Sequence, residues 1–73
     1  MTDNSKELVF VIISENQANY LLERVLRSAG YSVTAVKEKA VAEKMLETTQ
    51  PSLVVLSEQL VDGSGLELAR NLI

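Results

Sequence analysis

Polar side chains that could do chemistry follow two apolar runs of the sequence. Ser14 and Glu15 come directly after LVFVII (8–13), and Ser57 comes directly after LVVL (53–56). A hydroxyl can accept a phosphoryl group, and a carboxylate is a ligand for hard cations such as Mg²⁺. Ser57 is therefore a candidate phosphate acceptor for a Ser/Thr kinase, or a small polar residue that ends a strand. Glu15 is a candidate ligand for a weakly bound cation, or a solvated acid near a helix cap.

A second group of candidates lies in the loop after Ser57. Glu58 and Asp62 could add oxygen ligands, or they could be solvated loop acids. The segment Asp62-Gly63-Ser64-Gly65 could hold a phosphate on backbone N–H groups at the start of a helix. It lacks the lysine of a P-loop and the spacing of a dinucleotide-binding fingerprint, so the pattern favours a turn.

Composition excludes many other kinds of chemistry. The chain has 73 residues, of which 47% are hydrophobic, and it contains no cysteine and no histidine. Disulfides, thiolate or imidazole zinc sites and Ser-His or Cys-His nucleophiles are therefore excluded. We expect one small domain, no catalytic residues, no metal and no cofactor.

The charge pattern bears on partners and location. Ten acidic and seven basic residues give a net charge of −3, and they are mixed along the chain without a basic cluster. Nucleic-acid binding is therefore not expected. The longest apolar run, residues 8–13, is far shorter than the roughly 20 residues that span a bilayer, and MTDNSKE does not resemble a signal peptide. We expect a cytoplasmic protein without membrane contact.

Hydrophobic periodicity indicates alternating strands and helices. It predicts strands over residues 8–13, 31–36 and 53–57 and helices over 17–29, 38–48 and 65–73. This alternation is typical of an α/β fold with parallel strands and right-handed crossovers. The first and third strands are continuously apolar, as in strands covered on both faces, and the second alternates like an edge strand. The predicted spatial order is 2-1-3.

The same periodicity assigns faces to the helices. We expect a left-handed backbone conformation at Gly30, after the first helix. Tyr20 and Tyr31 are expected to pack at the edge of the core. One buried stripe is predicted on the first helix from Ala18, Leu21, Leu22, Val25, Leu26 and Ala29, and an inner face on the second from Val41, Ala42, Met45 and Leu46.

At this point the chain resembles the receiver domain of bacterial response regulators. Two stretches carry the resemblance: VFVIISENQANYLLERVLRSAGYSV (9–33) and PSLVVLSEQLVDGSGLELARNLI (51–73). In the second stretch, Ser57 takes the position of the phosphate-accepting Asp, and Gly65 precedes the Leu66-Glu67-Leu68 helix start. The resemblance implies a flavodoxin-like, three-layer parallel sheet, of which residues 1–73 would form the N-terminal portion, ending with the third helix.

Departures from the family pattern imply a loss of phosphotransfer. Receivers bind Mg²⁺ with an acidic pair after the first strand. This pair corresponds to Ser14 and Glu15 if one residue is deleted in the first helix, and to Ile13 and Ser14 without that gap. The usual loop proline is Val61, and the usual acidic residue before the loop glycine is Ser64. An acyl phosphate needs a carboxylate nucleophile, and Ser57 provides none. The resemblance thus implies a non-enzymatic pseudo-receiver of a two-component phosphorelay that signals through protein contacts.

An open strand edge indicates the kind of contact. In the order 2-1-3 the third strand has one neighbour, and exposed edges tend to pair with other chains. We expect a homodimer, or pairing with the remainder of a parent protein, through this edge. The resemblance adds a histidine kinase or an output domain as further partners. Two alternatives stay open: a switch phosphorylated at Ser57 or binding a cation through Glu15, and a truncated fragment without autonomous function.

Overall fold

The computed structural model of the chain describes residues 7–72 and is an α/β fold. Its parallel sheet has the order β2-β1-β3 and is consistent with a partial flavodoxin-like fold, as predicted. The three strands of this sheet are β1 (Leu8–Ile12), β2 (Ser32–Val36) and β3 (Leu53–Leu56). The three helices are α1 (Asn16–Ser28), α2 (Lys39–Thr48) and α3 (Gly65–Arg70).

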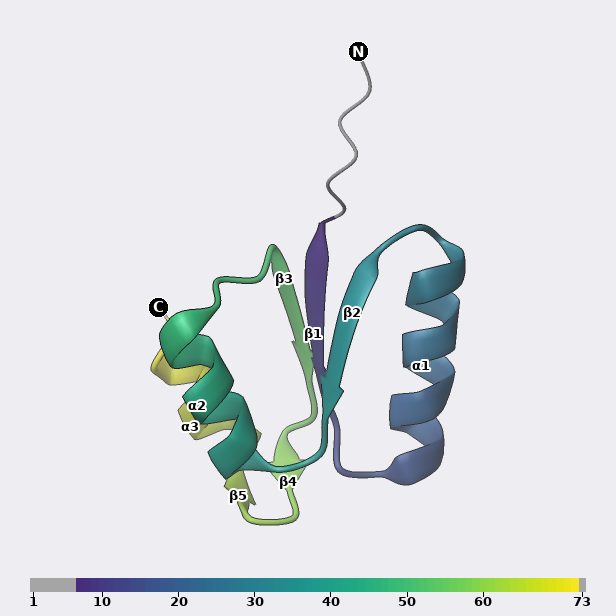
Figure 1. Ribbon diagram of the computed structural model, residues 1–73. Coiled ribbons are helices and arrows are strands. Elements are labelled where there is room, and N and C mark those ends of the chain that lie inside the picture. The colour runs from purple at the N-terminus through teal and green to yellow at the C-terminus, as the bar shows by residue number, and fades with distance from the viewer. Residues whose placement is uncertain (1–6, 73) are drawn as a thin grey trace.

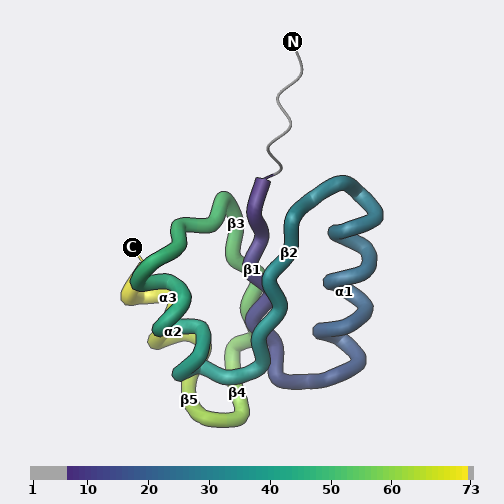
Figure 2. The backbone as a smooth tube through the Cα atoms, in the orientation of Figure 1, coloured from purple at the N-terminus to yellow at the C-terminus, as the bar shows by residue number. Residues whose placement is uncertain are grey.

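The helices divide unequally between the two faces of the sheet. α1 alone covers one face, and α2 and α3 lie together on the other (Figure 1). The backbone tube shows the same three layers (Figure 2). The sheet therefore has one face that two helices cover and one face that a single helix covers.

The central strand explains why the core has two halves. All of β1 after its first residue is buried, and successive strand residues point to opposite faces. Phe10 and Ile12 pack with Ala42, Leu60 and Leu68 on the α2–α3 face. Val9 and Val11 pack with Val33 on the α1 face. The continuous apolar run correctly predicted a central strand.

The segment after β3 is more ordered than the predicted loop. Residues Gln59–Leu60 (β4) and Gly63–Ser64 (β5) pair antiparallel and form a short hairpin. Leu60 is buried in the α2–α3 half of the core and anchors this hairpin. In Figure 1 the hairpin lies below the carboxyl ends of the parallel strands.

The third helix is shorter than the predicted range. α3 ends at Arg70, whereas the pattern predicted a helix over 65–73. The Asn71 N–H bonds to both Glu67 and Leu68, and the Leu72 N–H bonds back three residues to Ala69. Such tight bonds close the last turn of a helix and satisfy its terminal carbonyl groups. Ile73 lies outside the described residues.

The predicted buried stripe on α1 was wrong in part. Leu22 and Leu26 are half-buried against the core, as expected, but Leu21 and Val25 are 63% and 56% exposed. The periodicity identified an apolar surface that is wider than the contact with the sheet. Ala18 and Ala29 of the predicted stripe are also exposed.

Three aromatic or apolar positions outside this stripe also differ from the prediction. Tyr20, expected at the core edge, is 58% exposed beneath the Arg24 guanidinium. Tyr31 and Val41 are 40% and 41% exposed, so neither is fully packed. Gly30 has the predicted left-handed conformation, with φ of 100°.

Candidate functional site at the carboxyl end of the sheet

The predicted site residues lie where β1 and β3 end, side by side, at the carboxyl edge of the sheet. Open α/β sheets bind ligands at this edge, next to the point where the connections change face. Here the connection through α1 covers one face, and the connection through α2 covers the other (Figure 1). Ser14 and Glu15 follow β1 and Ser57 follows β3, and these two strands pair in parallel, so the three residues lie at the same edge.

Ser14 joins three segments of the chain through its hydroxyl group. Ser14 Oγ donates a hydrogen bond to the Lys37 carbonyl oxygen at 2.5 Å, just after β2. The same oxygen accepts a hydrogen bond from the Val61 N–H of the hairpin at 2.8 Å. The Ser14 hydroxyl thus acts as both donor and acceptor, and it links the end of β1 to the end of β2 and to the hairpin.

The Glu15 carboxylate caps α1. Its Oε1 accepts a hydrogen bond from the Ala18 N–H at 2.8 Å, and Oε2 accepts one from the Gln17 N–H at 3.2 Å. A side chain at this position satisfies N–H groups that have no partner inside the helix. The geometry is that of the helix-cap alternative predicted for Glu15.

Ser57 sits in a half-buried position at the end of β3. Its Oγ donates a hydrogen bond to the Gln59 carbonyl oxygen at 3.1 Å. The Gly65 backbone lies so close to the Ser57 carbonyl oxygen that a Cβ atom at position 65 would be only 1.9 Å from this oxygen. The Gly65 N–H also bonds to the Glu58 carbonyl oxygen at 2.8 Å. The glycine therefore lets the start of α3 pack directly on the end of β3.

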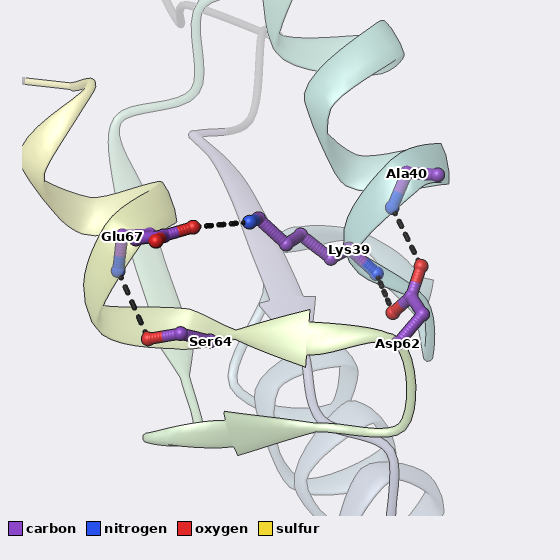
Figure 3. A network of polar contacts seen from close by, with 5 residues as sticks. All are labelled: Lys39, Ala40, Asp62, Ser64 and Glu67. Carbon is purple, nitrogen blue, oxygen red and sulfur yellow. Dashed lines mark hydrogen bonds and ion pairs between the residues drawn. The ribbon is translucent and has the colours of Figure 1, made fainter.

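Asp62 caps α2 from the hairpin (Figure 3). Its two carboxylate oxygens accept hydrogen bonds from the Lys39 and Ala40 N–H groups at 2.6 and 3.0 Å. These bonds, first from Ala40 and then from Lys39, hold the pKa of Asp62 below its ordinary value of 3.8. The carboxylate predicted as a loop acid thus connects two segments that are distant in sequence.

A second polar contact ties α2 to α3 in the same view (Figure 3). Lys39 Nζ lies 2.7 Å from Glu67 Oε1, and this bond raises the pKa of Lys39 and lowers that of Glu67. Ser64 Oγ accepts a hydrogen bond from the Glu67 N–H at 3.2 Å and caps α3. Ser64 is therefore a cap residue, which agrees with the turn favoured for this segment.

Asn19 is a structural residue that sequence reasoning missed. It lies at a buried position of α1, with only 3% of its surface exposed. Its Nδ2 donates hydrogen bonds to the carbonyl oxygens of Ile13 and Val36, at 2.8 and 3.0 Å. The sequence did contain a signal for this role. Asn19 is a polar residue between Ala18 and Leu22, on the side of the helix that the apolar pattern predicts to face the sheet. Asn19 holds the ends of β1 and β2 together.

The polar groups at this edge are thus bonded to the chain itself. Oxygens of Ser14, Glu15, Asp62 and Ser64 receive backbone N–H groups, and the Ser57 hydroxyl donates to a backbone carbonyl. Within residues 7–72, no group of three acidic side chains gathers as a metal site would require. The arrangement fastens loops and helix ends to the sheet.

None of the three described helices has the length and apolar character to cross a membrane.

Comparison with known proteins finds a similar segment in a much longer protein. Adventurous-gliding motility protein Z of Myxococcus xanthus (strain DK1622) is 36% identical over 64 residues. The matched segment covers 88% of this chain but only 5% of that protein. No family model matches the chain, and no solved structure matches it. The chain is therefore a homologue of a short segment of a motility protein.

Proposed function

We propose that this chain is a non-catalytic, receiver-like signalling module that acts through protein contacts. The main observation behind the proposal is that polar groups at the carboxyl edge of the sheet form hydrogen bonds with the backbone of the chain. Ser14, Glu15 and Asp62 hold backbone groups of the chain, and Ser57 is a hydroxyl rather than a carboxylate. A phosphoryl acceptor of the receiver type needs a free carboxylate and a bound divalent cation.

The relative supports a signalling role at a coarse level. The homologous protein is named for gliding motility, and the match extends over most of this chain. A short α/β segment in a much longer protein fits a module that receives or passes on a signal. We assign the chain to two-component phosphorelay signalling in the cytoplasm as part of the same proposal.

Protein contact is proposed to occur at the open edge of β3. Among residues 7–72, β3 has a strand partner on one side only, namely β1. An unpaired strand edge offers backbone N–H and C=O groups to another chain. The partners in this proposal are a second copy of the chain or the remainder of a parent protein, with a histidine kinase or an output domain as further candidates.

A phosphoryl-transfer measurement distinguishes this proposal from the alternative of a switch that is phosphorylated at Ser57. The chain is incubated with Mg²⁺ and acetyl phosphate, and intact mass is measured over time. We expect no added phosphoryl group on the wild-type chain and none on Ser57→Ala. The matched variant Ser57→Asp supplies the missing carboxylate. Phosphorylation of the wild-type chain that is lost in Ser57→Ala would refute the proposal, and reactivity gained by Ser57→Asp would favour the alternative of a phosphorylated switch.

A further inference from the structure

The two edge strands of the sheet differ in the side chains that lie along their open sides. β2 is the edge strand on one side of β1, and β3 is the edge strand on the other (Figure 1). The segment SLVVLS (52–57), which contains β3, has no charged residue and no proline. Native proteins commonly protect an exposed strand edge with charged side chains, proline or a bulge. Neither charge nor proline therefore protects the β3 edge.

Backbone hydrogen bonds show which groups of β2 face away from the sheet. The Ser32 N–H donates a hydrogen bond to the residue before β1, and the Val36 carbonyl oxygen accepts one from the residue after β1, both at 3.1 Å. Along a strand in a parallel pair, residues that bond to the neighbouring strand alternate with residues whose N–H and C=O groups point away from it. The N–H and C=O groups of Val33 and Ala35 therefore lie on the open edge of β2.

The Arg27 side chain of α1 reaches this open edge. Its Nη2 donates a hydrogen bond to the outward-pointing Val33 carbonyl oxygen at 2.9 Å. Its Nε donates a second hydrogen bond to Glu23 Oε2, one helical turn earlier, at 3.0 Å. The guanidinium group is thus held between a carboxylate and a strand carbonyl, while 54% of the side chain stays exposed. Arg27 therefore places a solvated positive charge on the β2 edge.

A second basic residue lies at the end of the same edge. Lys37 directly follows β2, and it lines a groove between α1 and β2 together with Arg27 and Ala35. A strand that pairs with β2 would take these charges out of water or push them aside, and Arg27 would then lose its bond to the Val33 carbonyl oxygen. Removing a charged group from water without a new partner is costly. The β2 edge is therefore protected in a way that the β3 edge is not.

We infer that Arg27 restricts strand pairing to the β3 edge, so that the chain engages a partner on one side of its sheet only. This inference rests on the proposed function, because it presupposes a contact at β3. A sheet with two open edges can add a further copy at each edge and continue as an open chain of copies. The occupant that Arg27 excludes is thus a second copy of this chain, whose uncharged β3 edge would otherwise pair with β2.

Sedimentation equilibrium of the whole chain and its variants tests this inference. Arg27→Ala removes the guanidinium group from the edge, and we expect its self-association constant to rise at least about tenfold over that of the wild-type chain, with species larger than a dimer. Arg24→Ala is the matched control, because it makes the same change of charge on α1. The Arg24 guanidinium lies 5.7 Å from the centre of the Tyr20 ring and makes no contact that involves the strand edge. Its variant should associate as the wild-type chain does.

A double variant shows whether the new association uses the β2 edge. Ala35→Pro removes an N–H group that points away from β1, so the pairing of β1 with β2 is preserved. Arg27→Ala combined with Ala35→Pro should return to the association of the wild-type chain. Hydrogen exchange gives a second measure, because the Val33 and Ala35 amides of Arg27→Ala should become protected as its concentration rises.

Two outcomes overturn the inference. One is a folded Arg27→Ala variant that associates no more than the wild-type chain. The other is association that persists in the double variant, because another surface then mediates it. If circular dichroism shows that Arg27→Ala is unfolded, Arg27→Gln replaces it with the same expectations, since glutamine removes the charge and is a good helix former. The phosphoryl-transfer measurement judges the non-catalytic role independently of these results.

Discussion

The two faces of the sheet carry similar apolar residues but differ in how well they are covered. On the α2–α3 face, Phe10, Ile12, Ala42, Leu60 and Leu68 are each at most 5% exposed. On the α1 face the buried hydrophobic residues are only valines, and Leu21 and Val25 of the helix remain exposed. Two helices and a hairpin close one face, whereas one helix cannot span three strands. Coverage, rather than residue type, decides burial here.

The largest expected effect comes from the well-covered face. We predict that Phe10→Ala costs about 3–5 kcal/mol, the usual range for a buried phenylalanine. Small domains have about 5 kcal/mol of stability or more, so this variant should keep only a small part of it. Val11→Ala, on the other face, removes two buried methyl groups and should cost roughly 2 kcal/mol. Urea unfolding followed by circular dichroism measures both, and equal losses would contradict the comparison.

A smaller effect is expected at the carboxyl end of the α2–α3 face in acid. The pKa values of Asp62 and Glu67 lie below their ordinary values of 3.8 and 4.5. Their stabilisation is therefore complete at neutral pH and is lost as the pH falls through the folded pKa values. We predict that the thermal midpoint declines below about pH 4.

Asp62→Ala serves as the control for this pH dependence. It removes the cap of α2, so its thermal midpoint at pH 7 should be lower than that of the wild-type chain. Its further decline in acid should be smaller, because one of the two titrating groups is absent. An identical acid profile would show that Asp62 does not contribute to the stability of this face.

The smallest effect on stability is expected at the exposed flank of α1. Leu21→Ala should change the free energy of unfolding by less than about 0.5 kcal/mol, because the side chain is 63% exposed. Leu68→Ala, which shortens the same residue type at a buried position, should cost about 2–5 kcal/mol. Urea unfolding compares the two. A large loss in Leu21→Ala would mean that the α1 face is better covered than its exposure indicates.

Sequence patterns predicted the architecture well because buried faces of strands and helices require apolar residues at regular spacings in the sequence. The continuous run at residues 8–13 predicted a central strand, and residues 9–12 are buried in β1. Strands alternating with helices predicted parallel pairing, and two continuously apolar strands with one alternating strand predicted the order 2-1-3. The helix stripe was less informative, since periodicity marks an apolar surface without saying how much of it is covered.

The sequence pointed to residues of the candidate site without revealing all of their contacts. Ser14, Glu15 and Ser57 were chosen because they follow two apolar runs. The role of Asp62 as a cap for α2 was missed, because Asp62 lies 22 and 23 residues from the N–H groups that it binds. Local spacing cannot reveal a hydrogen bond between segments that only the folded chain brings together.

The sequence by itself determined the order of elements, the central position of β1 and the absence of a carboxylate at position 57. These features depend on residue type and local periodicity. The tertiary structure alone decided that the Ser14 hydroxyl joins two distant backbone groups and that Leu21, Val25 and Leu53 stay exposed. Burial and hydrogen bonding at these positions depend on which segments lie side by side in the folded chain. The number of helices that cover each face of the sheet determines which side chains are buried.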